Sequence, residues 1–261
     1  MSATDGAGRP GSTDGAGRTG GGVVAVLTAA GSGTRLGAPG PKALVPLAHR
    51  PLLWWAARAL VEAGATAIVV TAPAEAVAEF RSALEGVGAE VAVVAGSAAS
   101  RQASVANGLG ALPPLDADDV VLVHDAARPL TPPSMIRRVA DAVRSGCDAV
   151  IPTVPVADTV KVVVPLAGGL GLVEGTPDRS SLAAVQTPQG FTWHTLRDAH
   201  RAGAARAADE GAAATDDAGL VEALGIAVHT VAGDPAALKI TRPEDLVVAE
   251  HLAARAGAGA R

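Results

Sequence analysis

The 261-residue chain has few aromatic residues and a single cysteine. Phe and Trp together make up only 2% of the sequence and Tyr is absent, so the core must be built from Ala, Val and Leu. The lone Cys147 excludes a disulfide framework and a cysteine-based zinc site, and it fits a reducing, cytoplasmic compartment. No apolar run reaches the roughly 18 residues of a membrane span. The length suits one α/β domain with a sizeable core.

The chain is acidic overall, and its positive charge comes mostly from arginine. The net charge of −5 argues against a nucleic-acid-binding surface. Arg outnumbers Lys 18 to 3, and the lysines are Lys42, Lys161 and Lys239. In a chain that uses Arg for its surface charge, each Lys is a candidate for a position that needs a compact ammonium group.

The two ends of the chain have little to bury. Residues 1–22 are rich in Gly, Ser, Thr, Asp and Arg, and TDGAGR occurs at 4–9 and again at 13–18. This composition predicts a disordered tail, without the apolar core of a signal peptide. We expect one domain over 23–254 and a frayed end over 255–261.

Between these ends, short Val-rich runs alternate with helical patterns. The runs expected to be strands are 23–28, 67–71, 90–94, 119–123, 148–152 and 226–231, and the expected helices are 51–64, 73–84, 131–144 and 192–206. Such alternation is typical of right-handed βαβ units. The predicted fold is α/β, with a Rossmann-like, mostly parallel sheet flanked by helices.

The first strand opens into a glycine-rich loop that carries two cations. Gly31, Gly33 and Gly37 lack Cβ atoms, so backbone N–H groups there can approach an anion closely, and Arg35 and Lys42 supply positive charge. The spacing G-x-G-x-x-x-G is one residue too long for the dinucleotide fingerprint, and the G-K-[ST] of a P-loop is absent. The pattern indicates a phosphate-binding loop of another kind.

Two further loops follow strands at the same expected edge of the sheet. In residues 95–105, Arg101 and Ser104 stand at the start of a helix, where N–H groups favour an anion or an acceptor edge. The hexapeptide HDAARP, 124–129, places Asp125 just beyond a buried strand, where open α/β sheets bind their ligands. A carboxylate there can hold a ribose hydroxyl or a hydrated Mg²⁺ ion.

The second half of the chain contains a predicted β-hairpin. Valines alternate with polar residues over 159–165 and 170–174, on either side of a Gly-Gly turn. A two-stranded ribbon is marginal alone, so this arm, about 157–178, is expected to pack on a second copy of itself.

Polar clusters continue beyond the arm. The segment VQTPQGF spans 185–191, and Thr215, Asp216 and Asp217 are expected to begin a helix as caps. Lys239 lies in a strand-like run, and Thr241 with Glu244 matches a capping box for the last helix.

Several of these motifs together resemble one family. The sequence AAGSGTRLG followed by PK at 41–42 resembles the nucleotide-binding signature of sugar-phosphate nucleotidyltransferases. HDAARP and LKITRPED narrow the resemblance to the 2-C-methyl-D-erythritol 4-phosphate cytidylyltransferase family, over about 23–254. The resemblance implies transfer of a cytidylyl group from CTP to 2-C-methyl-D-erythritol 4-phosphate, with release of pyrophosphate, in non-mevalonate isoprenoid biosynthesis.

The resemblance also implies roles for individual residues. Catalytic roles fall on Arg35, Lys42 and Lys239; nucleotide-binding roles on Ala29, Ala30, Gly31, Gly33, Gly96, Arg101, Ser104 and Asp125; and substrate-binding roles on Thr159, Arg179 and Asp125. Mg²⁺ or another divalent cation is implied at Asp125, directly or through water. A homodimer is implied, in which arm residues complete the partner's site. The family's pattern before Arg101 is matched loosely, because one extra residue is present and Ala99 occupies its acidic position.

Two alternatives remain open at this point. A cytidylyltransferase for another polyol phosphate, such as ribitol 5-phosphate, would share the nucleotide half of the site. A catalytically silent nucleotide-binding protein would bind CTP without releasing pyrophosphate. In every case the expected partners are small phosphorylated molecules, with neither nucleic acid nor a membrane.

Overall fold

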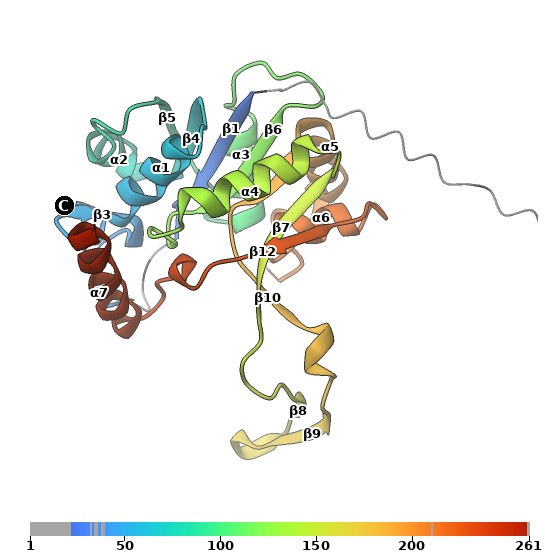
Figure 1. The fold of residues 1–261 in the computed structure, drawn as a ribbon. Coiled ribbons are helices and arrows are strands. Elements are labelled where there is room, and N and C mark those ends of the chain that lie inside the picture. The colour runs from blue at the N-terminus through green and yellow to red at the C-terminus, as the bar shows by residue number, and fades with distance from the viewer. Residues whose placement is uncertain (1–21, 32, 34–35, 38–39, 210, 260–261) are drawn as a thin grey trace, which may run out of the picture.

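The structure is a computed structural model that describes residues 22–31, 33, 36–37, 40–209 and 211–259. Apart from Gly22, the predicted N-terminal tail lies outside these residues. Figure 1 shows a central sheet with helices on both faces and an arm projecting away from the sheet.

One large sheet organises the described chain. Its strand order is β10-β7-β11-β6-β1-β4-β5, and β12 pairs with β7. The strands are β1 (Val23–Thr28), β4 (Ala67–Ala72), β5 (Glu90–Ala95), β6 (Val120–Asp125), β7 (Ala149–Pro155), β10 (Ala183–Val185), β11 (Gln189–Thr192) and β12 (His229–Ala232). The pairs of β1 with β4 and β6, of β4 with β5, and of β12 with β7 are parallel, which confirms the predicted mostly parallel sheet.

Both faces of the sheet are covered, because its central strands are apolar on both sides. In β1, Ala25 and Leu27 face one cluster, whereas Val24 and Val26 face the other. The first face is covered by α1 (Leu52–Glu62), α2 (Val77–Ala83) and α4 (Pro133–Arg144), and the second by α3 (Arg101–Leu109), α5 (Trp193–Gly203) and α6 (Asp217–Glu222). The predicted core of small aliphatic side chains is confirmed.

Short 3-10 helices connect several of these elements. They are η2 (Lys42–Leu44), η3 (Ala74–Ala76), η4 (Ala167–Gly169), η5 (Arg179–Ser181), η6 (Ala204–Arg206) and η7 (Pro235–Ala237).

Two strands of the large sheet were not predicted. β10 and β11 run antiparallel to their neighbours, and β11 inserts between β6 and β7. Gly190 in β11 is packed so tightly that a Cβ there would lie 2.6 Å from Val139 Cγ1. A short strand that contains Gly lacks the β-branched run by which a strand is recognised, which explains the omission. The last strand, β12, also begins later than the predicted run 226–231.

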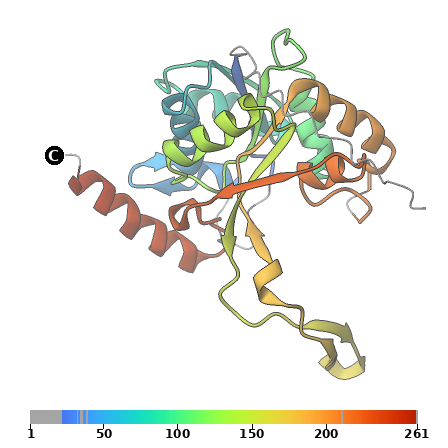
Figure 2. The ribbon, with the colours of Figure 1, turned by 45° about the vertical axis from the view of Figure 1, so that its right-hand side comes forward.

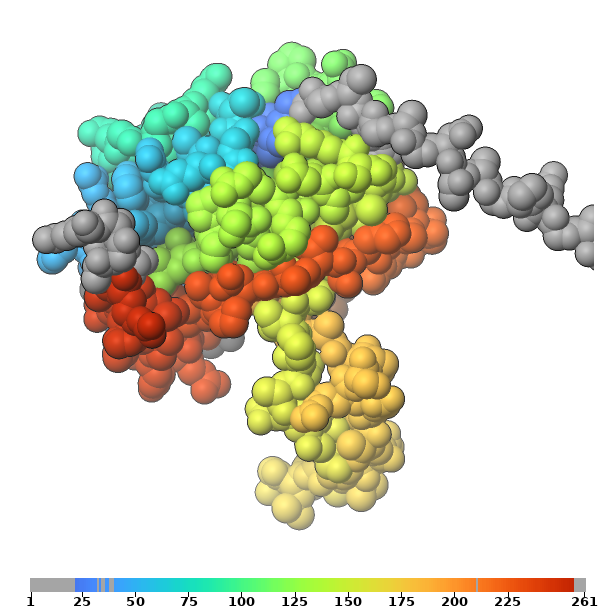
Figure 3. All heavy atoms as spheres, viewed as in Figure 1, coloured from blue at the N-terminus to red at the C-terminus, as the bar shows by residue number. Residues whose placement is uncertain are grey.

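The predicted hairpin is confirmed as β8 (Val162–Pro165) and β9 (Gly171–Gly175), which pair antiparallel around η4. Figures 1 and 2 show this arm leaving the body of the molecule beyond β7 and β10, and Figure 3 shows it standing clear of the other elements. The arm exposes a set of large apolar side chains, namely Val160, Val162, Val163, Val164, Leu166, Leu170, Leu172 and Val173.

The last helix, α7 (Pro243–Gly259), packs on the start of α1 through a small cluster that includes Leu52, Ile240 and Ala249. The predicted capping box needs a correction, because the carboxylate that serves this helix end is Asp245 and not Glu244. Asp245 Oδ2 accepts hydrogen bonds from the Thr241 amide at 2.7 Å and its hydroxyl at 2.8 Å. Among the described helices, none combines the length and the apolar character needed to cross a bilayer.

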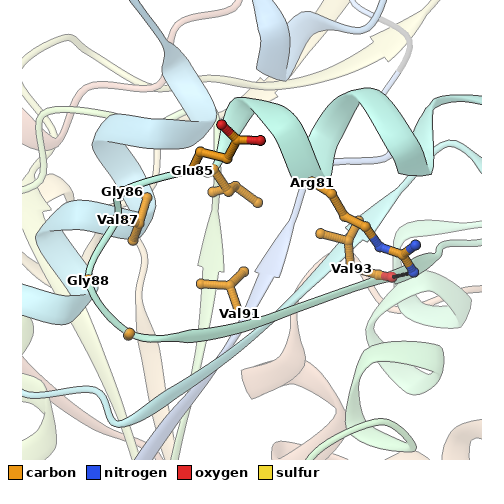
Figure 4. A pocket seen from close by; sticks show the side chains of 9 residues that line it. Arg81, Glu85, Gly86, Val87, Gly88, Val91 and Val93 are labelled. Carbon is orange, nitrogen blue, oxygen red and sulfur yellow. Dashed lines mark hydrogen bonds between the residues drawn. The ribbon is translucent and has the colours of Figure 1, made fainter.

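A small surface pocket lies between α2 and β5 (Figure 4). It has a volume of about 220 Å³ and is lined by Arg81, residues 84–89, Val91 and Val93. The Arg81 guanidinium closes one side by donating to the Val93 carbonyl at 3.3 Å. Because residues 84–89 precede β5, this pocket faces the amino ends of the parallel strands, away from Asp125.

A tight turn before α1 contains backbone strain that can be tested. Strands β2 (Pro46–Leu47) and β3 (Arg50–Pro51) are joined by Ala48 and His49, with φ values of 47° and 70°. This geometry favours Gly, so we expect His49→Gly to raise the free energy of unfolding by up to about 1 kcal/mol. Urea denaturation measures the change. The control Ala74→Gly, at an exposed position without positive φ, should instead lower stability; a loss in both variants would contradict the assignment of strain.

Candidate active site

Asp125 lies at the carboxyl end of β6, beside the end of β1. The two strands are in register with Thr28 opposite Asp125. The Thr28 hydroxyl donates to Asp125 Oδ1 at 3.1 Å, and Asp125 is only 6% exposed. The nearly buried carboxylate is therefore held at the edge where parallel sheets bind ligands.

Two cations meet this carboxylate. Lys239 Nζ lies 2.8 Å from Asp125 Oδ2, and the Arg101 guanidinium lies 3.3 Å from Oδ1. Burial by itself would raise the pKa of Asp125, but Arg101 and then Lys239 hold that pKa far below its ordinary value. Asp125 is therefore ionised near neutral pH.

Lys239 reaches Asp125 from a distant part of the sequence. After β12 the chain passes through η7, and the Ile240 amide donates to the Ala127 carbonyl at 2.8 Å. Arg128 donates to the Ala237 carbonyl at 2.6 Å and to the Val185 carbonyl at 3.3 Å. These bonds fasten the HDAARP loop to the segment that carries Lys239.

The Thr187 hydroxyl forms hydrogen bonds with the end of β6. It accepts from the Asp125 amide at 3.0 Å and lies 2.9 Å from His124 Nδ1. Thr187 lies two residues before β11, whose antiparallel pairing with β6 brings the TPQ segment to this edge.

The glycine-rich loop brings Lys42 to the same edge. Gly33 has a φ of 69°, and a Cβ at this position would lie 2.8 Å from Lys42 Cβ, so only Gly allows the loop to pack against the lysine. A Cβ on Gly31 would meet nothing within 4 Å, which leaves its backbone open. Arg35, the third predicted catalytic cation, lies outside the described residues.

The predicted nucleotide-binding residues from three loops also meet. A Cβ on Gly96 would lie 2.8 Å from Ala30 Cβ and 3.2 Å from Ser104 Oγ. Ser104 Oγ in turn accepts from the Ser97 amide at 2.9 Å. The loops after β1 and β5 and the first turn of α3 therefore form one continuous surface, on which Ala29 is fixed by donating its amide to the Thr71 carbonyl at 3.0 Å.

Thr159 and Arg179 lie elsewhere, at the base of the arm. Arg179 donates to the Ala157 carbonyl at 2.7 Å and lines an open groove of about 800 Å³ between residues 153–157 and 178–183. Thr159 is exposed beside it. Within the described chain, neither residue forms a hydrogen bond or ion pair with Asp125.

Three buried polar residues near Asp125 were not predicted. Asp217, expected only as a cap, is 1% exposed and lies 2.7 Å from Arg101 Nη1 and 2.9 Å from His200 Nε2. Gln189 Oε1 accepts the amides of Asp217 and Ala218 at 3.1 and 3.0 Å. The actual cap is Asp216, which accepts from the Gly219 amide at 2.9 Å. The sequence does not distinguish Asp216 from Asp217. Only their burial in the structure shows which one caps the helix and which one forms the ion pair.

The donor set suits a cation that arrives with a phosphate. Within the described residues, no three His, Cys, Asp or Glu side chains are clustered so as to hold a metal ion. Mg²⁺ is commonly held by one or two carboxylates together with substrate phosphates and water, so a single carboxylate is sufficient. Asp125, at the phosphate-facing edge, is the residue that fits.

An open α/β sheet with a glycine-rich loop, a lysine and an ion-paired aspartate at its carboxyl edge defines a nucleotide-binding enzyme of the nucleotidyltransferase class. The model of the 2-C-methyl-D-erythritol 4-phosphate cytidylyltransferase family matches residues 23–255, and the chain belongs to this family. The predicted family and the predicted enzyme class, a cytidylyltransferase, are therefore confirmed.

Individual relatives agree with this assignment. The chain is 51% identical to 2-C-methyl-D-erythritol 4-phosphate cytidylyltransferase of Rhodococcus jostii, over 88% of this chain and 94% of that one. It is 52% identical to the Nocardia farcinica enzyme, over 91% and 96%. Among solved structures, the Thermus thermophilus enzyme is 37% identical, with a TM-score of 0.67 over 88% of this chain and 98% of that one.

The buried His124 makes stability depend on pH. Burial lowers the pKa of His124 to about 4. The folded protein therefore resists a proton that the unfolded chain accepts below about 6.5, so stability is complete above that pH and falls as the pH drops towards 4. The contribution is up to about 1.4 kcal/mol per pH unit.

We expect His124→Asn, which keeps an amide near the Nδ1 position, to flatten the dependence of unfolding free energy on pH between 7 and 4.5, measured by urea denaturation. The matched control, His251→Gln, replaces an exposed histidine with an uncharged amide. Parallel slopes in the wild type and His124→Asn would show that His124 does not titrate as described.

Proposed function

We propose that this chain transfers a cytidylyl group from CTP to 2-C-methyl-D-erythritol 4-phosphate. An oxygen of the acceptor phosphate forms a bond to the α-phosphorus of CTP, the bond from that phosphorus to the β-phosphate oxygen breaks, and pyrophosphate leaves. The observation that carries the proposal is the placement of Lys239, Asp125 and the Gly33–Lys42 contact at one edge of the sheet. Family membership supports the choice of both substrates.

The reaction needs fixed positive charge near the phosphates more than it needs a general base. The second pKa of a phosphate monoester is about 6, so the nucleophile is already largely anionic near pH 7. The barrier comes from repulsion between two polyanions and from charge that develops around the α-phosphorus. Fixed cations aimed at that phosphorus reduce both.

The three predicted catalytic cations would share this task. Lys42 and Lys239, with Arg35, would surround the triphosphate. Lys239 is 45% exposed at its side chain although it pairs with Asp125, so one side of its ammonium group is available to a phosphate oxygen. Asp125 would hold the ribose or the metal while it keeps Lys239 in place.

A divalent cation fits the same arrangement. Mg²⁺ held by Asp125, directly or through water, and by the phosphates would neutralise charge on the leaving pyrophosphate. The protein's own contribution is to fix the carboxylate, through Thr28 and the Thr187–amide bond, where that ion and the phosphates meet.

The surface made by Ala30, Gly96 and Ser104 would receive the nucleoside. Small residues there leave room for a flat base, and the Ser104 hydroxyl can exchange its bonds within the loop for bonds to the base edge. Gly31 and Ala29 would contribute backbone groups to the phosphates. Arg101 lies between the two regions, beside Asp125.

The arm would complete a second subunit's site. Eight large apolar side chains are exposed on a two-stranded ribbon, which is more than such a ribbon normally leaves in water. A second arm would cover them, and Thr159 and Arg179 would then face the partner's phosphate edge. This assembly accounts for the separation of these two residues from Asp125 within one subunit.

The direct test measures pyrophosphate release from CTP with each candidate acceptor. We expect turnover with 2-C-methyl-D-erythritol 4-phosphate and much weaker turnover with ribitol 5-phosphate. Preference for ribitol 5-phosphate would replace the acceptor. Binding of CTP without any release of pyrophosphate would favour a silent nucleotide-binding protein instead.

Replacing Lys42 tests the role of the cations. Lys42→Ala should lower kcat by about 100-fold or more, which is the scale for losing a charge contact made in the transition state. The matched control is Lys161→Ala, because Lys161 lies on the arm and donates to Thr176 Oγ1 at 2.6 Å. Equal turnover of wild type and Lys42→Ala would remove Lys42 from the mechanism.

Sharing of the site between subunits predicts complementation. Mixed dimers of Lys42→Ala and Arg179→Ala chains contain one site with both residues intact, so random mixing should restore about a quarter of the wild-type sites. Activity is measured after the two inactive proteins are dissociated together and allowed to reassociate. If the mixture stays as inactive as its components, Arg179 acts within its own subunit or not at all.

A further inference from the structure

A row of alternating charges runs inward from the proposed phosphate site. Lys239 pairs with Asp125, Asp125 with Arg101, Arg101 with Asp217, and Asp217 with His200. Side-chain exposure along the row is 45% at Lys239, 9% at Asp125, 26% at Arg101 and 1% at Asp217. The inner end of the row therefore lies in the protein core, where polar contacts are strong and hard to rearrange.

The Asp217 carboxylate is fixed on both sides. Oδ2 lies 2.7 Å from Arg101 Nη1, and Oδ1 lies 2.9 Å from His200 Nε2. Its backbone amide donates to Gln189 Oε1 at 3.1 Å. Burial would raise the pKa of Asp217, but Arg101 and His200 hold it below the ordinary value. Asp217 is thus a rigid, ionised anchor.

Arg101 lies closer to the Asp217 carboxylate than to the Asp125 carboxylate. Its contact with Asp217 is 2.7 Å, whereas its contacts with Asp125 Oδ1 are 3.3 Å from Nη2 and 3.4 Å from Nε. An arginine free of Asp217 would close on Asp125 as a tight two-pronged pair, which is the geometry that guanidinium and carboxylate groups favour. The inner carboxylate therefore keeps Arg101 at the outer limit of contact with Asp125.

The fold does not depend on the buried ion pair between Arg101 and Asp217 alone. The neighbours of Arg101 already bind the stretch from the end of α5 towards α6: Ser100 donates to the Ala207 carbonyl at 2.6 Å, and Gln102 donates to the Gly203 carbonyl at 2.9 Å. Gln102 also accepts the Ala214 amide at 3.0 Å. Because a buried ion pair adds a desolvation cost, its presence here suggests a role in positioning.

We propose that Asp217, held by His200, is a positioning residue that draws the Arg101 guanidinium away from Asp125. Asp125 then keeps its close pair with Lys239 and its freedom to receive the incoming nucleotide and its metal. The inference deepens the proposed function and rests on the roles given there to Asp125 and Lys239.

A double-mutant cycle tests the inference. Asp217→Asn keeps the size and the backbone of the anchor but removes its charge. In the wild-type background we expect kcat for pyrophosphate release to fall about tenfold, and the dissociation constant of Mg·CTP to change as well. In an Arg101→Gln background, Asp217→Asn should change each quantity by less than about twofold, because its effect passes through Arg101.

A residue needed only for stability gives another pattern. Asp217→Asn would then lower kcat by the same factor in both backgrounds, or would leave the kcat of the folded enzyme unchanged, and either result overturns the inference. The matched control is Asp198→Asn, which breaks an exposed pair with Arg197 of similar length, 2.8 Å, and should not alter kcat.

A second pair of variants covers the case in which Asp217→Asn does not fold. His200→Gln keeps a donor near Nε2 and should retain most of the activity, whereas His200→Leu leaves Asp217 Oδ1 without its partner and should lower kcat unless Arg101 is also replaced. Equal activity of the two variants contradicts the inference. Because Mg·CTP binding is measured beside turnover, an incorrect acceptor would abolish turnover in the wild type and still leave the binding cycle interpretable.

Discussion

The ion pair between Asp125 and Lys239 is the contact on which the rest of the site depends. It joins the end of β6 to a segment that follows β12, more than a hundred residues later in the chain. The Asp125 carboxylate is almost fully buried. It can stay ionised there only beside a cation such as Lys239, because an unpaired buried charge strongly destabilises the folded state. The Asp125 amide donates to the Thr187 hydroxyl, and the Ile240 amide donates to the Ala127 carbonyl, which fastens the Lys239 segment to the loop after β6.

This arrangement explains why the surrounding fold has its particular connections. The antiparallel strand β11 brings Thr187 to the end of β6, and β12 pairs with β7 before the chain passes through η7 to Lys239. α3 starts beside both and supplies Arg101. The arm leaves the sheet beyond β7 (Figure 1), and Arg179 lies at its base, where it donates to the Ala157 carbonyl.

Much of the fold could be predicted because the signals are local. Runs of Val mark the buried parallel strands, and Gly-Gly between alternating valines marks the arm. HDAARP and the glycine-rich loop identified Asp125 and Lys42 as neighbours of one edge, because the carboxyl ends of parallel strands must lie together. Lys239 was recognised by its motif, and its contact with Asp125 is visible only in the structure.

The features that were not predicted depend on contacts between residues distant in sequence. β11 is short and contains a glycine that packing against α4 requires, so its pattern resembles a loop. Asp217 follows a genuine cap and looks like one, although its side chain turns inward to Arg101 and His200. Asp245 replaces Glu244 as the partner of Thr241, because the helix begins one residue later than the capping-box spacing assumes.

The central claim is that CTP phosphates bind where Asp125 and Lys239 meet, beside the glycine-rich loop. A crystal structure with Mg²⁺ and a CTP analogue that cannot be cleaved between the α- and β-phosphates tests it most directly. The account predicts triphosphate oxygens within hydrogen-bond distance of both Lys42 Nζ and Lys239 Nζ, with the cytosine near Ser104. A triphosphate bound elsewhere, with the pair of Asp125 and Lys239 facing only solvent, would contradict it.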